Sequence, residues 1–235
     1  MLTWLIFIAR NLAISFVMKN IILDLCGGSG SWSDTYKAAG FKVYNITLPA
    51  FDITKYAMSN DCVIFQSQDL GGADLSIPFC DIYGILAAPP CQEFSLAKGS
   101  QKRDFVKGIN IVNSCLAIIQ GVRLKHKLEF WAMENPCGFL RQFIGKPYFS
   151  FRFWEYGDDI IKRTDLWGYF NIPAKTTTVR PANVIKSIKF VFNVANYAEQ
   201  TKFRQRTRPG FAAAFFKANS KGRKSKIYNL KSEIA

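Results

Sequence analysis

A glycine-rich turn between an apolar run and a helical stretch constrains the fold of this chain more than any other feature. Residues 20–25 are rich in leucine and β-branched residues, CGGSGSWS follows at 26–33, and a helix is predicted from about 33 to 39. Glycine lets the backbone turn tightly and approach a ligand, and the following helix N-terminus favours negative charge. In an open α/β sheet, ligands lie beyond the carboxyl ends of the strands. Because the GxGxxG fingerprint is not met, this motif alone does not distinguish a ligand-binding turn from a purely structural one.

Further apolar runs alternate with a helical pattern along the first half of the chain. Strands are predicted at 41–48, 61–66, 82–88 and 128–136. Before the last of these, apolar residues recur at 105, 109, 112, 116, 119 and 122, which is the spacing of one face of a long helix. Short apolar strands that alternate with helices predict an α/β fold with a parallel sheet covered on both faces.

The second half of the chain is predicted to be less regular. Residues 147–171 are aromatic and irregular, and residues 172–207 shift toward Thr, Lys, Arg and Asn, which indicates a small β or loop insert. RPGFAAAFFKAN at 208–219 has a proline near a helix start and predicts a helix that returns to the core. The predicted organisation is a core at 18–171, the insert, the returning helix and a basic tail at 220–235.

Residues 1–17 form an apolar leader that Arg10 and Asn11 interrupt. A spanning helix needs about 20 largely apolar residues, and a charge near its middle is costly. We interpret Met18 as the translation start and the leader as an artefact of start assignment. A genuine interfacial or packing helix is the alternative, and no stable membrane association is expected.

The charge of the chain indicates a polyanionic partner. The 235 residues include 31 Lys and Arg against 17 Asp and Glu, a formal net charge of +14, and 49% are apolar, enough for a sizeable core. Lys and Arg gain affinity by displacing counterions from phosphates. Charge alone does not separate nucleic acid from an acidic membrane surface.

The cysteine and histidine content argues against a metal site. Six cysteines are scattered without a CxxC pair, and His126 is the only histidine. A zinc site is therefore not expected, and mechanisms that need a Cys/His or Ser/His pair would depend on His126 alone. Because several of the cysteines lie in apolar runs, we interpret them as reduced thiols of an intracellular protein.

Cys91 stands directly after Pro89 and Pro90, at the end of a predicted buried strand. The two prolines form a stiff platform that would hold the thiol in one place. Lysine and arginine residues at 98–107 predict an electropositive setting, which favours the nucleophilic thiolate. A structural cysteine is the alternative, and we prefer that interpretation for the other five cysteines.

Glu134 follows the apolar run FWAM and precedes Asn135 and Pro136. A carboxylate there would lie at the carboxyl edge of the sheet, and partial burial would raise its pKa toward a value suited to proton donation. For a single glutamate, a solvated strand end or helix cap is the more common role. The glycine turn, Cys91 and Glu134 together form a stronger signal than any one of them.

In this order, these residues resemble the DNA cytosine-5 methyltransferase family, in particular its short bacteriophage and prophage members. DLCGGSGSWS is similar to the cofactor turn of the family, APPCQEFS to its nucleophile loop, ENP to its glutamate motif and RPGFAAAFFKAN to its closing helix. KRTDLWGYF at 162–170 is similar to a further segment of the phage members. The resemblance implies a Rossmann-like S-adenosylmethionine-dependent methyltransferase fold with a small target-recognition insert. It also implies double-stranded DNA as partner, S-adenosylmethionine as methyl donor, no metal, and a bacterial host or phage-infected cell.

The resemblance implies a role for each matching position. Cys91 would attack carbon 6 of a flipped-out cytosine, Glu134 would protonate ring nitrogen 3, and a basic residue would hold the base, for which Arg163 is our candidate beside Lys162. The residues implied to bind the cofactor are Asp24, Gly27, Gly28, Gly30, Asp52 and Asn219.

The chain departs from the family pattern at the second predicted strand and in the target-recognition region. Family members place an acidic residue at the end of that strand for the ribose hydroxyls, whereas Thr47 and Leu48 stand here, and we take Asp52 as the substitute. The target-recognition region is confined to 172–207, so readout of base edges is expected to be short. Two alternative functions remain at this point: methylation of RNA cytosine, and DNA binding by a catalytically weak protein of the same fold.

Overall fold

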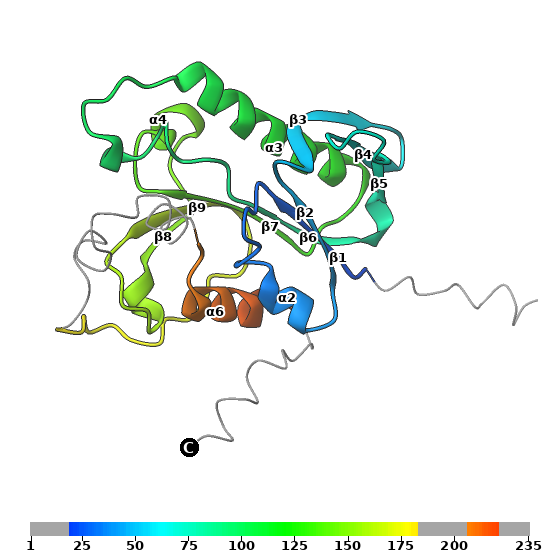
Figure 1. Ribbon diagram of the computed structural model, residues 1–235. Coiled ribbons are helices and arrows are strands. Elements are labelled where there is room, and N and C mark those ends of the chain that lie inside the picture. Colours follow the sequence, from blue (N-terminus) through cyan, green and yellow to red (C-terminus); the bar gives the residue numbers. More distant parts are fainter. Residues whose placement is uncertain (1–18, 183–205, 221–235) are drawn as a thin grey trace, which may run out of the picture.

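The computed structural model describes residues 19–182 and 206–220 (Figure 1). The predictions for the leader at 1–17, for most of the insert at 172–207 and for the tail beyond residue 220 therefore lie outside the described residues.

A six-stranded mixed sheet forms the centre of the molecule, in the order β2-β1-β6-β7-β9-β8. β2, β1, β6 and β7 run parallel, β9 pairs antiparallel with β7, and β8 pairs antiparallel with β9. The strands span Ile21–Leu25 (β1), Lys42–Ile46 (β2), Ile82–Ala87 (β6), Phe130–Pro136 (β7), Phe149–Arg152 (β8) and Arg163–Tyr169 (β9). The predicted α/β architecture is confirmed, and four carboxyl ends of parallel strands meet at one edge of the sheet.

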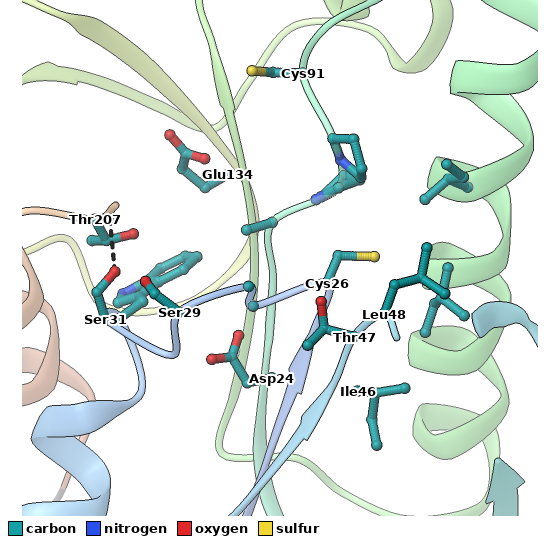
Figure 2. A pocket seen from close by; sticks show the side chains of 18 of the residues that line it. Asp24, Cys26, Ser29, Ser31, Ile46, Thr47, Leu48, Cys91, Glu134 and Thr207 are labelled. Atoms are coloured by element: carbon teal, nitrogen blue, oxygen red, sulfur yellow. Dashed lines mark hydrogen bonds between the residues drawn. The ribbon is translucent and has the colours of Figure 1, made fainter. Parts of the chain in front are cut away.

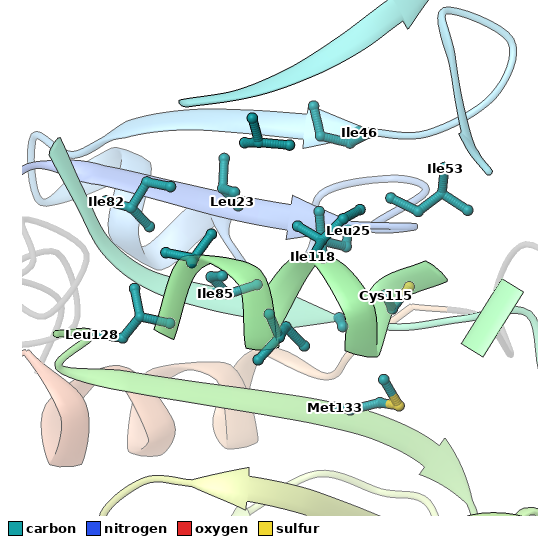
Figure 3. Close-up of a cluster of buried hydrophobic side chains, with 14 of the residues drawn as sticks. Leu23, Leu25, Ile46, Ile53, Ile82, Ile85, Cys115, Ile118, Leu128 and Met133 are labelled. Atoms are coloured by element: carbon teal, nitrogen blue, oxygen red, sulfur yellow. The ribbon is translucent and has the colours of Figure 1, made fainter. Parts of the chain in front are cut away.

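Helices cover both faces of this sheet. Figure 1 shows α3 (Phe105–Lys125) on one face, and α2 (Asp34–Ala38) with α6 (Pro209–Asn219) on the other. Side chains of a buried strand alternate between the two faces, so Leu23 belongs to the cluster under α3 and Ile22 to the cluster under α6. Figure 3 shows the α3 cluster, where Ile118 packs among residues of β1, β6 and β7. Burying such a side chain contributes about 1.5–3 kcal/mol.

α3 has the length and apolar composition of a membrane-spanning helix. Its Val112, Ile118 and Val122 are nonetheless fully buried against the sheet. This helix therefore serves as a core helix, and it is the one such candidate in the described part of the chain.

A second, antiparallel sheet of three strands lies beside α3 (Figure 1). It consists of β3 (Phe51–Met58), β4 (Cys62–Ser67) and β5 (Leu75–Pro78). The predicted strand at 61–66 corresponds to β4, which pairs in this small sheet and not in the parallel one. We did not predict β3 or β5 from the sequence, because apolar and polar residues alternate there without a continuous apolar run.

Residues 147–171 were expected to be irregular, whereas the structure forms β8 and β9 there, joined through a 3₁₀ turn at Phe153–Tyr156. β9 adds to the free edge of β7, with Glu134 opposite Leu166 in the register. The edge of β7 provides backbone hydrogen bonds for β9, and β9 provides them for β8, so these short strands depend on tertiary pairing. Short helices complete the described elements at Phe79–Asp81 (η1), Leu96–Lys98 (η2) and Leu140–Ile144 (α4).

Candidate functional site

A cavity of about 490 Å³ opens at the carboxyl ends of β1, β2, β6 and β7. Figure 2 shows Cys91 and Glu134 in its upper part and Asp24 below them. Six of the residues predicted for the site line it, namely Asp24, Gly27, Gly28, Asp52, Cys91 and Glu134. Segments more than 100 residues apart thus meet here, because parallel strands end at the same edge.

The glycine turn after β1 has a backbone that requires glycine. Gly28 and Gly30 have φ of 55° and 73°, and a Cβ at Gly27 would overlap the Asp24 carboxylate. The turn closes through a hydrogen bond from the Gly30 amide to the Gly27 carbonyl (2.9 Å), and Asn45 Nδ2 donates to the Gly28 carbonyl (2.9 Å). Gly30 belongs to the turn but is absent from the described residues that line the cavity.

Asp24 lies fully buried beneath this turn. Ser33 Oγ donates to Asp24 Oδ2 at 2.5 Å, whereas Oδ1 finds no hydrogen-bond partner within the described part of the chain. Burial raises the pKa of Asp24 to about 7, and the hydrogen bond from Ser33 opposes this shift. An unpartnered buried oxygen at a cavity wall is available to a bound ligand.

The wall opposite the glycine turn is largely apolar, with Ile46, Leu48, Phe51 and Ile53. Asp52 supplies the carboxylate there, and its Oδ1 accepts hydrogen bonds from the Thr54 amide (2.9 Å) and hydroxyl (2.8 Å). An apolar wall with a few fixed polar groups is typical of a small-molecule site.

Cys91 is held by the backbone around it. Asn135 is fully buried and donates from Nδ2 to the Pro89 carbonyl at 3.0 Å, which fixes the proline platform to β7. The Cys91 carbonyl accepts from the Phe94 amide (3.0 Å) and the Ser95 amide (2.8 Å), so a tight turn follows the thiol.

The electrostatics of Cys91 differ from the expected electropositive setting. Burial raises the pKa of the Cys91 thiol, Lys162 lowers it and Glu134 raises it further. The basic residues downstream do not contribute to this shift, and two of them, Lys98 and Arg103, bond to Glu93. The cation that lowers the pKa of the thiol is therefore Lys162, 71 residues further along the chain.

Lys162 and Glu134 form an ion pair inside the cavity, with Nζ and Oε1 3.5 Å apart. Both side chains are largely buried, with exposed fractions of 23% and 12%. Lys162 also lies 5.6 Å from the centre of the Phe153 ring. Arg163 begins β9 opposite Arg152, is exposed, and is absent from the described residues that line the cavity.

Asn219 lies away from the cavity, at the far end of α6. Its Oδ1 accepts from the Asn171 amide (2.7 Å) and its Nδ2 donates to the Asn171 carbonyl (3.0 Å). Asn171 follows the end of β9, and because β9 runs antiparallel to β7, that end lies at the opposite edge of the sheet. Asn219 therefore joins α6 to the main sheet and does not reach the candidate site.

Several residues that line the cavity were not predicted as site residues. Thr47, Gln92, Arg206 and Thr207 line the cavity, and the Thr207 amide donates to Ser31 Oγ at 3.0 Å. That bond joins residues 176 positions apart, and no local pattern reveals it. Within residues 19–182 and 206–220, no cluster of three or more metal-binding side chains exists.

No family model matches the chain. The chain is similar to the Type II methyltransferase M.DdeI of Desulfomicrobium norvegicum, with 33% identity over 128 residues. The alignment covers 51% of this chain and 28% of that protein, so the chain spans little more than a quarter of the length of the curated relative it matches. The α/β fold and the cavity at its sheet edge agree with a methyltransferase relative.

Proposed function

We propose that this protein is an S-adenosylmethionine-dependent DNA methyltransferase that acts on carbon 5 of cytosine. The observation that carries the proposal is that Cys91, Glu134 and Lys162 converge in one cavity with the glycine turn after β1. The similarity to a Type II methyltransferase supports the class of reaction. The Rossmann-like methyltransferase fold belongs to the same proposal, and the mixed sheet with one antiparallel strand supports it.

The lower part of the cavity fits S-adenosylmethionine. The turn at Gly27 and Gly28 leaves no room for a side chain at Gly27, Asp24 keeps an unpartnered oxygen, and Asp52 stands on the apolar wall. We assign the cofactor to these residues, with Asp52 toward the ribose. When bound, S-adenosylmethionine supplies an electrophilic methyl group for transfer to carbon 5.

Cys91 is the proposed nucleophile. Its thiolate attacks carbon 6 of the cytosine, and Glu134, which carries a proton for this step, donates it to ring nitrogen 3, so that carbon 5 becomes nucleophilic. After methyl transfer, water takes the proton from carbon 5, the bond between carbon 6 and Cys91 breaks to restore the thiolate, and the proton on ring nitrogen 3 returns to Glu134. Burial raises the pKa of the free thiol, so the positive charge of Lys162 is needed to stabilise the thiolate.

The substrate base must leave its duplex to reach Cys91. The face of a stacked cytosine is inaccessible, so enzymes that modify a base extrude it into a pocket. The net charge of +14 suits binding to the phosphate backbone while the base is extruded. The described part of the candidate site contains no metal cluster, and the proposed reaction uses none.

Covalent trapping tests this proposal. The full-length protein is incubated with labelled S-adenosylmethionine and a duplex that contains 5-fluorocytosine, whose fluorine blocks the elimination step. We expect a stable protein–DNA adduct that maps to Cys91. Cys91→Ser should abolish the adduct, whereas Cys62→Ser, in β4 outside the lining of the cavity, should retain it.

Two other results would change the assignment. An adduct with 5-fluorocytosine RNA but not with DNA would make RNA the substrate. DNA binding without an adduct on either nucleic acid would indicate a DNA-binding protein that keeps the fold without the chemistry.

A further inference from the structure

The turn that carries Cys91 is fastened to the start of α3 through one side chain, that of Glu93. Glu93 Oε2 accepts from Lys98 Nζ at 2.5 Å and from the Asp104 amide at 2.7 Å. Asp104 in turn caps α3, because its Oδ1 accepts from the Lys107 amide at 2.9 Å. The carboxylate two residues after Cys91 therefore joins the start of the loop of 92–104 to the residue that caps α3.

The backbone of Glu93 belongs to the same network. Arg103 donates from one guanidinium nitrogen to the Glu93 carbonyl (2.9 Å) and from another to the Gly99 carbonyl (3.2 Å). The guanidinium also lies 4.7 Å from the centre of the Phe139 ring. Glu93 and Lys98 each have a side chain only 19% exposed, so this pair is screened less than an open surface pair. The positive charges of Lys98 and Arg103 thus compensate the negative charge of the Glu93 carboxylate.

Beyond this network, the loop has exposed side chains. Leu96 is 61% exposed, and residues 99–102 of the same loop are also exposed. On the other side of Glu93, Phe94 is fully buried and its carbonyl accepts from the Phe139 amide at 2.8 Å. Glu93 stands at the boundary between the buried turn after Cys91 and the exposed part of the loop.

We propose that Glu93 is a positioning residue for the Cys91 thiol, acting through its bonds to Lys98 and to the Asp104 amide. The inference that this positioning serves methylation rests on the proposed function. Loss of the carboxylate charge releases the loop, so that Cys91 becomes more accessible to small reagents and less well placed for attack on a base. A displacement of about 1 Å at a reacting group can reduce a rate by about 100-fold.

Alkylation of Cys91 tests the positioning without any substrate. Full-length protein is treated with iodoacetamide between pH 7 and 10, and labelling of each cysteine is measured by peptide mass spectrometry. In Glu93→Gln we expect the labelling rate of Cys91 to rise at least several-fold at each pH, because access to the thiol changes and its protonation does not. Lys175→Met removes an ion pair to Glu155 (2.8 Å), whose two residues do not line the cavity, and should leave Cys91 labelling within about twofold.

The trapping reaction with 5-fluorocytosine DNA provides the second measurement. Glu93→Gln should form the adduct about 10- to 100-fold more slowly, with unchanged affinity for S-adenosylmethionine. Unchanged Cys91 alkylation, or faster adduct formation, would overturn the proposal. Altered alkylation of Cys91 with no adduct from the unmodified protein would keep Glu93 as a positioning residue and refute the proposed methylation instead.

Discussion

At the scale of single residues, the candidate site contains buried charges whose surroundings control their protonation. Asp24 has a pKa of about 7, well above the ordinary value near 3.8, because burial disfavours the carboxylate. Lys162 lies 3.5 Å from Glu134 and lowers the pKa of the Cys91 thiol, which burial and Glu134 raise. The chemistry proposed for the cavity depends on these two environments.

Asp24 makes the stability of the protein fall as pH rises from about 4 to about 7. The folded state holds the Asp24 proton more tightly than the unfolded chain, so its stabilising contribution is complete below pH 4 and is lost by pH 7. In that window, the free energy of unfolding should fall relative to Asp24→Asn by up to about 1.4 kcal/mol per pH unit. Urea unfolding of both proteins at a series of pH values measures this. Parallel pH profiles would show that Asp24 titrates normally.

Lys162 and Arg163 are adjacent in sequence but are predicted to differ in effect. Lys162→Met removes the cation beside Cys91 and Glu134, so covalent trapping should slow at least 10-fold and its pH profile should move to higher pH. Arg163→Met is the matched control, because Arg163 is exposed outside the lining of the cavity. Trapping rates for both variants measure the difference. A larger loss in Arg163→Met would contradict the assignment of Lys162.

At the scale of secondary-structure elements, the glycine turn is joined to the segment before α6. The Thr207 amide donates to Ser31 Oγ, and both residues line the cavity. The two elements that flank the cofactor side of the cavity therefore come from opposite ends of the chain and share a hydrogen bond.

Ser31→Ala is predicted to loosen this junction. Loss of one hydrogen bond of this kind costs about 0.5–1.5 kcal/mol. The Thr207 amide should therefore exchange with solvent faster, by the equilibrium factor to which this free energy corresponds. Hydrogen exchange resolved to that peptide measures the effect. Ser114→Ala, which removes a bond within α3 to Asn110, should leave exchange at Thr207 unchanged. Equal exchange in Ser31→Ala and the unmodified protein would mean that this junction does not hold the segment.

At the scale of the whole molecule, α3 runs from the carboxyl edge of the sheet to the opposite edge. Exposed Lys102 and Lys107 lie at its start, beside the Cys91 loop, and exposed Lys125 lies at its end. A duplex that places a base in the cavity can contact the first pair but not Lys125. The part of the net charge near the cavity is therefore expected to carry the proposed DNA binding.

The salt dependence of DNA binding tests this placement. Each phosphate contact contributes about −0.9 to the slope of log affinity against log salt concentration. Lys102→Gln and Lys107→Gln should each make the slope shallower by about one contact, whereas Lys125→Gln should leave it unchanged. Filter binding or fluorescence anisotropy over a salt series gives the three slopes. An effect of Lys125→Gln equal to that of Lys107→Gln would place the duplex elsewhere on the molecule.

The sequence by itself determined the elements whose signal is local. β1, β6 and β7 are continuous apolar runs, α3 has a long helical repeat, and the glycine turn and the proline platform are read directly from their residues. Tertiary structure decided what depends on distant partners. β8 and β9 form because the edge of β7 offers hydrogen bonds, and the bonds of Asn219 to Asn171 fix it at the far edge. Lys162, the residue before β9, lines the cavity while Arg163, the first residue of β9, does not, and only the placement of β9 beside β7 shows which of the two lies at the site.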